Sequence, residues 1–256
     1  MPKLYTMSII SSLQVPYPDL RVTANSSLHD YTIHDPELSE LGRSQCAELG
    51  KNLREKLPKD LDVGLILCSA MRRTCETTKL ALGDWAAEKG IPIQAHAGWQ
   101  ENSAKACDTG SPIAAVAAEF PEIDFSHVDP VFPDKTSPAG EKYKYLQANL
   151  LARAQMVLRD LYDRPEKAII VVSHSGFLRQ CVTGDWYFNA DYRLYDLAEK
   201  EGGEGKLELK QWDLTKSGHG GMGWSWDEVV EIGVGLPERE LPPDAEAPLP
   251  ADIRPN

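Results

Sequence analysis

Arginine, carboxylate and histidine side chains each follow an apolar run of this sequence within a few residues. Arg73 comes after VGLILCS, Glu101 comes after IPIQAH, and His174 directly follows AIIVV and a serine. An arginine presents forked donors that suit phosphate or carboxylate. A carboxyl group beside an aromatic ring can act as a general acid, and a histidine titrates near pH 7. Together the three side chains predict a site that binds a small anion and moves a proton.

Each candidate also has a simpler interpretation. Arg72 and Arg73 lie where a predicted strand meets the start of a helix, whose free N–H groups attract anions, but two surface arginines on a helix are the commoner case. Arg72 should point away from Arg73, because adjacent helix residues do not share a face. Glu101, in the segment Trp-Gln-Glu-Asn, could equally be a solvated loop residue.

The third candidate group is Ser173-His174-Ser175-Gly176. A histidine directly after an apolar strand and before a helix that starts at glycine lies at the carboxyl edge of a sheet. That position favours a functional role for His174, with Ser175 as an anion-binding neighbour.

The elements that must position these residues alternate along the chain. Apolar runs predict strands over residues 3–10, 63–69, 91–96 and 168–173, an edge strand over 206–214, and helices over 40–57, 71–89, 112–119, 140–162 and from Gly176. Ser39 is the expected N-cap of the first helix. Alternation of this kind predicts an α/β fold, a single three-layer domain whose mostly parallel sheet carries helices on both faces. Ligands bind outside the carboxyl ends of such strands, so the three groups should meet there.

Two polar segments and a tail complete the chain. Residues 11–38 and 121–139 are rich in turn-forming residues, and we expect loops there that determine substrate choice, the second being a candidate lid. The domain is expected to cover residues 1–235. Residues 236–256 are Pro-rich and acidic, and a disordered tail is predicted.

Composition excludes several functions. The 256 residues carry a formal net charge of −12 without a Lys/Arg-rich run, so no nucleic-acid partner is expected. No apolar stretch approaches the ~20 residues of a membrane span. The five cysteines form no C-x-x-C pair, which favours free thiols and a cytoplasmic location. No metal-ligand spacing and no phosphate-loop or dinucleotide motif occurs, so neither a metal nor a cofactor is predicted. Nothing in the sequence indicates an oligomeric state.

Several segments, in order and at plausible spacing, resemble the histidine phosphatase superfamily, the phosphoglycerate mutase-like proteins, and especially its fungal members. They are Asp35-Pro36-Glu37-Leu38-Ser39, Ser69 to Thr77, Trp99-Gln100-Glu101, Cys107 to Ser111 and Val171 to Phe177. The resemblance implies a phosphoglycerate mutase-like fold. It also implies Arg73 as a phosphate clamp, Glu101 as the general acid and His174 as the second histidine of the pocket.

One part of the family pattern is missing. The family signature opens with Arg-His-Gly or Arg-His-Ala at the end of the first strand, and that histidine becomes phosphorylated. No arginine in this chain is followed by histidine, and Ser8 and Ile9 stand near the expected place. His29 and His34, the nearest histidines, lie beyond the strand end.

Four hypotheses therefore stand at this point. The first is a repurposed enzyme that binds an anionic small molecule and performs acid–base chemistry such as elimination, isomerisation or cyclisation. The second is a small-molecule phosphomonoester phosphatase that uses direct water attack or another nucleophile. The third is a non-catalytic binding or scaffold protein. The fourth is that residues 1–30 reflect a misread gene rather than a genuine replacement of the motif.

Overall fold

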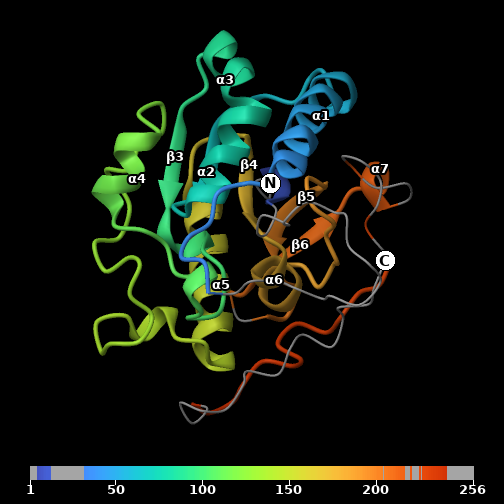
Figure 1. Cartoon of the computed structure of the whole chain (residues 1–256). Coiled ribbons are helices and arrows are strands. Elements are labelled where there is room, and N and C mark those ends of the chain that lie inside the picture. Colours follow the sequence, from blue (N-terminus) through green and yellow to red (C-terminus); the bar gives the residue numbers. More distant parts are fainter. Residues whose placement is uncertain are drawn as a thin grey trace, which may run out of the picture.

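The computed structural model describes residues 5–12, 32–203, 205–216, 220, 225 and 227–240. Six strands within these residues form one sheet in the order β3-β2-β4-β1-β5-β6 (Figure 1). The strands are β1 (Tyr5–Ser12), β2 (Val63–Ser69), β3 (Ile93–His96), β4 (Ala168–His174), β5 (Tyr192–Glu199) and β6 (Leu207–Gln211). The first four run parallel to one another, while β5 is antiparallel to β1 and β6 is antiparallel to β5. The predicted α/β class and the mostly parallel sheet are confirmed.

The carboxyl ends of the parallel strands are level. Cys68 of β2 pairs with Val172 of β4, and Ser69 pairs with His96 at the end of β3. On the other side of β4, Ser12 of β1 pairs with His174. All seven residues of β4 are buried, as expected for a strand covered on both faces. One sheet edge therefore gathers the residues that follow four strands.

Helices cover both faces of the sheet, so the fold has three layers (Figure 1). One face carries α1 (Glu40–Lys56), α2 (Arg72–Thr78), the π-helical turn Lys79–Gly83 and α3 (Asp84–Lys89). The other carries α5 (Gln147–Asp163) and α6 (Ser175–Phe177), which continues into a π-helical turn over Leu178–Val182. The remaining described elements are the helices α4 (Ile113–Glu119) and α7 (Asp213–Lys216) and the 3-10 turns Ala97–Trp99, Ala106–Asp108 and Glu141–Tyr143.

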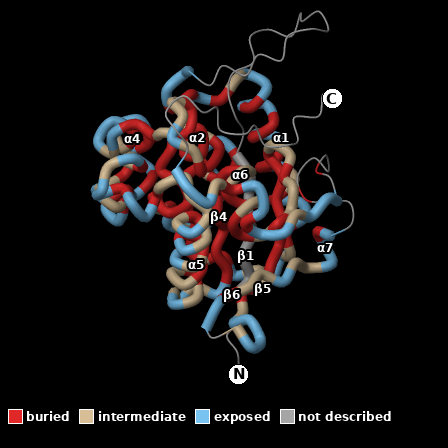
Figure 2. The backbone as a smooth tube through the Cα atoms, turned by 90° about the horizontal axis from the view of Figure 1, so that it is seen from below, coloured by how far each residue is buried: buried red, intermediate tan, exposed pale blue. Residues whose placement is uncertain are grey.

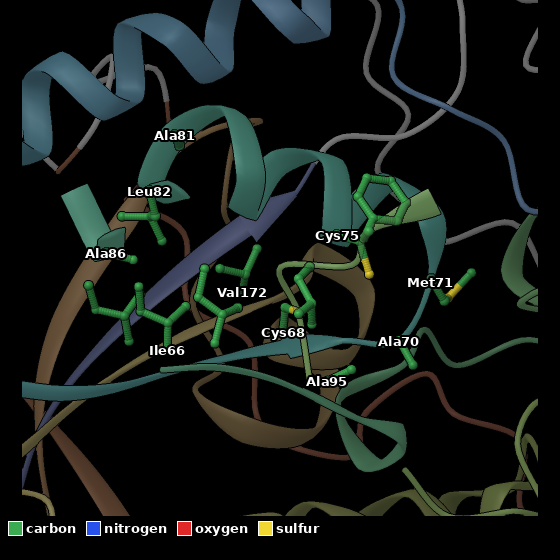
Figure 3. Close-up of a cluster of buried hydrophobic side chains, with 14 of the residues drawn as sticks. Ile66, Cys68, Ala70, Met71, Cys75, Ala81, Leu82, Ala86, Ala95 and Val172 are labelled. Atoms are coloured by element: carbon green, nitrogen blue, oxygen red, sulfur yellow. The ribbon is translucent and has the colours of Figure 1, made fainter. Parts of the chain in front are cut away.

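Successive residues of the central strands serve two separate cores. Ile66 and Cys68 of β2 join the apolar cluster beneath α1 to α3, where Figure 3 shows them beside Val172. Leu65 and Leu67 point to the opposite face and join the cluster beneath α5. The alternation follows from the two-residue period of a strand. Figure 2 shows the result, with buried residues along the strands and exposed residues on the outer surfaces of the helices.

Helix α1 begins where the sequence predicts. The Ser39 side chain accepts a hydrogen bond from the Gly42 backbone N–H at 3.1 Å, which satisfies one of the free donors of the first turn. The helix ends at Lys56, ahead of Pro58. Its buried stripe includes Leu49 and Leu53, which lie four residues apart on the face that meets the sheet.

Four elements differ from the sequence prediction. The helix predicted over 71–89 is divided into α2, a π-helical turn and α3, and the edge strand predicted over 206–214 ends at Gln211, ahead of α7. Helix α5 starts at Gln147 rather than near Gly140, because Lys144 and Leu146 adopt extended backbone and only a single 3-10 turn, Glu141–Tyr143, precedes them. Strand β5 was not predicted. Arg193 is buried in that strand beside apolar neighbours, which obscures the alternation expected of a strand with one solvated face.

Residues 121–139 are anchored to the domain. Ile123, Phe125, Val128 and Phe132 are all buried in the cluster beneath α1 to α3. After α4, the Asp124 backbone pairs with Ala95 of β3. A segment that buries four apolar side chains behaves as part of the core, which argues against the free lid considered from its sequence.

The start of the expected tail also contacts the domain. Leu236 is buried in the cluster beneath α5, and the Pro237 carbonyl accepts a hydrogen bond from the Gln147 backbone at 2.8 Å. Residues 241–256 lie outside the described residues, as do His29 and most of the predicted loop 11–38. Among the described helices, none is long and apolar enough to cross a membrane.

Candidate active site

The carboxyl ends of β2 and β4 are joined by a side-chain hydrogen bond. His174 Nε2 lies 2.9 Å from the Ser69 hydroxyl, and both residues are buried. Burial lowers the pKa of His174 well below its usual value, and the charges of Arg73, Lys135 and Arg153 add to that effect. The imidazole is therefore neutral at pH 7. Its Nδ1 atom is buried without a hydrogen-bond partner.

Arg73 turns inward from the first turn of α2. Its guanidinium donates to the Cys107 carbonyl at 2.7 Å and pairs with Asp108 at 3.3 Å. Its Nε atom is buried and has no partner. Arg72, the next residue along the helix, points away and binds Glu119 at 2.5 Å, as predicted for helix neighbours.

Glu101 is buried in the loop that follows β3. One carboxyl oxygen accepts a hydrogen bond from the Asn102 backbone at 2.9 Å. Burial raises the pKa of Glu101 and the nearby Asp108 adds to this, while the charges of Arg73 and Lys135 oppose it. A carboxyl group with a raised pKa holds its proton to higher pH, as a general acid requires.

The start of α6 lies against this carboxyl group. A Cβ atom added at Gly176 would stand 2.7 Å from Glu101 Oε1, so only glycine leaves room for the side chain. Glu101 thus lies next to Gly176, and Gly176 follows His174 by two residues in the sequence. Ser175 itself donates its hydroxyl hydrogen to the Tyr187 carbonyl at 3.1 Å. The Ser175 hydroxyl hydrogen is therefore already used within the protein and is not directed to an anion.

Lys135 was not identified from the sequence. It is buried, and its ammonium group donates to the carbonyl oxygens of Glu101 at 2.7 Å, Ser103 at 2.8 Å and Asp108 at 2.5 Å. Burial lowers the pKa of Lys135 to about 7. A single lysine in a loop rich in turn-forming residues gives no sequence signal, because it looks like any solvated loop residue.

Arg153 was also missed. It comes from the middle of α5, donates to the Gln100 carbonyl at 3.1 Å and to Asn102 Oδ1 at 2.9 Å, and stacks 4.0 Å above the Phe177 ring. Burial lowers its pKa to about 10. A signal for this residue does exist: Arg153 falls three residues after Leu150 and one before Ala154, within the apolar stripe of the helix.

These residues form a cluster of buried charge, which we call the polar centre. It consists of Arg73, Glu101, Asp108, Lys135, Arg153 and His174, with exposed fractions of 1%, 4%, 7%, 3%, 2% and 1%. Three permanent or potential cations face two carboxyl groups, one of which tends to keep its proton. The polar centre is therefore short of negative charge.

A hollow lies beside Lys135, one member of the polar centre. It measures about 320 Å³ and is lined by Ala104, Thr109, Pro133, Asp134, Lys135 and Thr136. His96, at the end of β3, accepts a hydrogen bond at Nδ1 from the Gly98 backbone at 3.0 Å, and its Nε2 lies 3.9 Å from Asp160 of α5. Within the described residues, no group of three or more His, Cys, Asp or Glu side chains could hold a metal ion.

Comparison with known proteins adds one relative from the curated proteins. A probable phosphatase of Schizosaccharomyces pombe is 34% identical over 149 residues, which cover 57% of this chain and 65% of that protein. The chain thus spans just under two thirds of the length of this relative.

Solved structures with a similar chain path include two enzymes. The ecdysone phosphate phosphatase of Bombix mori matches at 13% identity with a TM-score of 0.49, covering 80% of this chain and 92% of that one. The phosphoglycerate mutase of Bacillus anthracis matches at 13% identity with a TM-score of 0.45, covering 82% and 93%. Both TM-scores are below 0.5, so the family assignment does not rest on them.

The family itself is established by sequence. Residues 24–187 match the model of the histidine phosphatase superfamily, branch 1. This range covers more than half of the chain and includes β2 to β4 together with every member of the polar centre. The chain belongs to the histidine phosphatase superfamily.

Proposed function

We propose that this chain hydrolyses a small phosphomonoester at the polar centre. Membership of the superfamily and the relative described as a probable phosphatase both support this reaction. The phosphatase hypothesis thereby moves ahead of the acid–base alternative that the sequence alone favours.

The surplus of buried positive charge is the observation that carries the proposal. A buried ion loses several kcal/mol of hydration free energy, which a partner of opposite charge must offset. Arg73 has one carboxylate partner and an unpartnered Nε, and Arg153 has two unpartnered nitrogen atoms. A phosphate group supplies the missing negative charge and the missing acceptors.

The roles follow from the chemistry of each group. Arg73 clamps the phosphate oxygens through its forked donors, and neutral His174 contacts the same group. Glu101 in its protonated form gives its proton to the leaving alcohol as the bond from phosphorus to oxygen breaks. Ser175 contributes to anion binding as an acceptor or through its backbone, since its hydroxyl hydrogen is engaged with Tyr187.

The sequence also constrains the attacking group. No arginine in this chain is followed by histidine, and we propose that the histidine phosphorylated in the family signature has no counterpart here. We propose attack by water, so that one water and the ester give the alcohol and inorganic phosphate without a phosphoenzyme. Splitting a displacement into two steps requires a nucleophile, so this one-step route should be slow with generic esters.

A second candidate function rests on the same missing histidine. Arg73, Glu101 and His174 can stabilise a developing anion and move a proton, which suffices for elimination, isomerisation or cyclisation of an anionic small molecule. This function differs from the first in one measurable respect, since it releases no inorganic phosphate by hydrolysis of a phosphomonoester.

The test combines tungstate binding with phosphate release. We expect tungstate to bind the wild-type chain, and Arg73→Ala to weaken that binding by about tenfold or more, the value of one or two charge-assisted hydrogen bonds. Arg73→Lys, which keeps the charge but loses the fork and guards against misfolding, should fall between the two. Arg72→Ala is the matched control, because Arg72 points to Glu119. Its binding should stay within about twofold of wild type.

The outcomes separate the hypotheses. Slow release of phosphate from p-nitrophenyl phosphate with no trapped phosphoenzyme supports the proposal. Tungstate binding without any phosphate release from a panel of phosphomonoesters favours the acid–base function. Absence of tungstate binding contradicts both and leaves the scaffold hypothesis.

We also propose a cytoplasmic location. All five cysteines are buried and unbonded to one another, as is usual in a reducing compartment.

A further inference from the structure

Lys135 meets three carbonyl oxygens and an ammonium group has three N–H donors. Each donor has one acceptor, and the three distances of 2.5 to 2.8 Å are those of charge-assisted bonds. The three acceptors belong to Glu101, Ser103 and Asp108, which all lie in the loop after β3. Lys135 itself lies in the separate segment after Phe132. The contact therefore joins two segments that are distant along the chain.

The loop that Lys135 holds carries two functional parts. The first is Glu101, whose carbonyl oxygen accepts a hydrogen bond from Lys135. The second is the pair of groups that bind the Arg73 guanidinium, namely the Cys107 carbonyl and the Asp108 carboxylate. Within the loop, the Ser103 hydroxyl donates to Asp108 at 2.6 Å. The loop has little regular structure of its own, with short 3-10 turns over Ala97–Trp99 and Ala106–Asp108. Its shape therefore depends on contacts from outside.

Four charged groups of the polar centre act on the ammonium group. Glu101 and Asp108 favour its charged form, while Arg73 and Arg153 oppose it, and the neutral ring of His174 is within range of its charge. A buried lysine in such a place is costly, and an apolar side chain would fill the same space at lower cost. The presence of a lysine at position 135 is therefore better explained by the loop that it holds in place than by a contribution to the free energy of unfolding.

We propose that Lys135 is a positioning residue, which sets the general acid Glu101 and the partners of Arg73 by tying their loop to the segment 133–136. This inference rests on the proposed function for the roles of Glu101 and Arg73. A displacement of about 1 Å in a reacting group can reduce the rate by about 10²-fold, which is the scale of the expected effect.

The first test replaces Lys135 with methionine and follows the loop directly. Methionine keeps the length of the stem and removes the three donors. We expect amide hydrogen exchange in peptides over residues 99–109 to accelerate by about tenfold or more, while peptides over β2 and β4 keep their wild-type rates. Lys142→Met is the matched control. That lysine is half-exposed and pairs with Asp129, so its loss should leave the loop unchanged.

The second test reads the consequence for function. In Lys135→Met, kcat for p-nitrophenyl phosphate should fall by about 10- to 100-fold while KM rises by about fivefold or less, since the acid acts in the transition state. The affinity for tungstate should fall by about fivefold, because Arg73 loses fixed partners. Lys135→Gln, which retains two of the three donors, should be intermediate in all three measurements and serves if the methionine variant folds poorly.

A small amine supplies a further check. In Lys135→Ala, ethylammonium added to the solution should restore part of the lost protection over residues 99–109, entering through the hollow that Lys135 lines. Ethanol, of similar size but neutral, should not.

Two results would overturn the inference. One is wild-type exchange over residues 99–109 in Lys135→Met. The other is faster exchange with kcat and tungstate affinity unchanged, which reduces Lys135 to a structural tie. If wild-type protein releases no phosphate, the proposed function fails, while exchange and tungstate affinity still decide the role of Lys135.

Discussion

Two regions of this molecule are equally sealed from water and are built in opposite ways. The cluster beneath α1 to α3 is filled by apolar side chains such as Ile66, Leu82 and Val172 (Figure 3). The polar centre at the carboxyl edge of the sheet is filled by charged ones. Each apolar side chain contributes about 1.5–3 kcal/mol to stability by leaving water, whereas each buried charge costs hydration free energy.

The apolar cluster stabilises the fold, whereas the polar centre contains the side chains proposed to bind and convert the substrate. Among the described buried residues that form the apolar cluster, no side-chain nitrogen or oxygen atom is sealed from water without a partner, although Trp212 Nε1, which packs against the cluster, is. In the polar centre, Arg73 Nε, Arg153 Nε and His174 Nδ1 are buried without one. Such groups usually indicate a ligand, ordered water or a functional role. Substitutions in the first region should therefore change stability, and substitutions in the second should chiefly change activity.

The largest expected effect is on turnover and comes from Glu101→Gln. The amide has nearly the shape of the acid but cannot give a proton to the leaving group. We expect kcat to fall by about 10²- to 10⁴-fold with tungstate affinity changed by less than about threefold. Steady-state kinetics and calorimetry on the same preparation measure the two quantities. A variant that loses binding as much as turnover would show that Glu101 is a binding group rather than the acid.

The next effect is on stability and comes from Ile170→Ala in β4. The side chain is completely buried in the apolar cluster, so its truncation removes buried surface and leaves a cavity. We expect the free energy of unfolding in urea to fall by about 2–5 kcal/mol, with kcat per folded molecule nearly unchanged. A large loss of kcat in the folded fraction would mean that the two regions are coupled and would break the comparison.

The smallest effect is a pH dependence that belongs to the polar centre alone. The pKa of Lys135 is about 7 in the folded chain and about 10.5 when unfolded. Between these values the unfolded chain holds a proton that the native chain lacks, so the free energy of unfolding rises with pH by up to about 1.4 kcal/mol per unit. Lys135→Met lacks this contribution, and its stability should rise less than that of wild type between pH 7.5 and 8.5.

Urea titrations at the two pH values check the difference. Lys142→Met, which removes an exposed lysine, should keep the wild-type slope. Equal slopes in wild type and Lys135→Met would show that the carbonyl contacts keep Lys135 charged throughout this range.

The sequence predicted the central strands and the start of α1 better than it predicted the buried charged residues. Apolar runs predicted β2, β3 and β4, and the serine before a helical pattern predicted the start of α1, because both signals depend on neighbours along the chain. Strand β5 was missed because Arg193 is a charged residue that is buried within it, so the sequence does not show the alternation of apolar and polar residues expected of a strand. Arg73, Glu101 and His174 were found because each follows a strand, and parallel strands end at the same edge.

The sequence by itself determined the α/β class, strands β2 to β4, the start of α1, the family, and three of the groups in the polar centre, since these depend on local pattern and spacing. Only the tertiary structure added Lys135 and Arg153, which come from a loop and from mid-helix. It also placed the Ser175 hydroxyl on Tyr187 and Arg72 on Glu119. The physical reason is that burial and charge balance arise from contacts between segments far apart in the chain, such as the 34 residues that separate Lys135 from Glu101. The raised pKa of Glu101 and the lowered pKa of His174 follow from that burial.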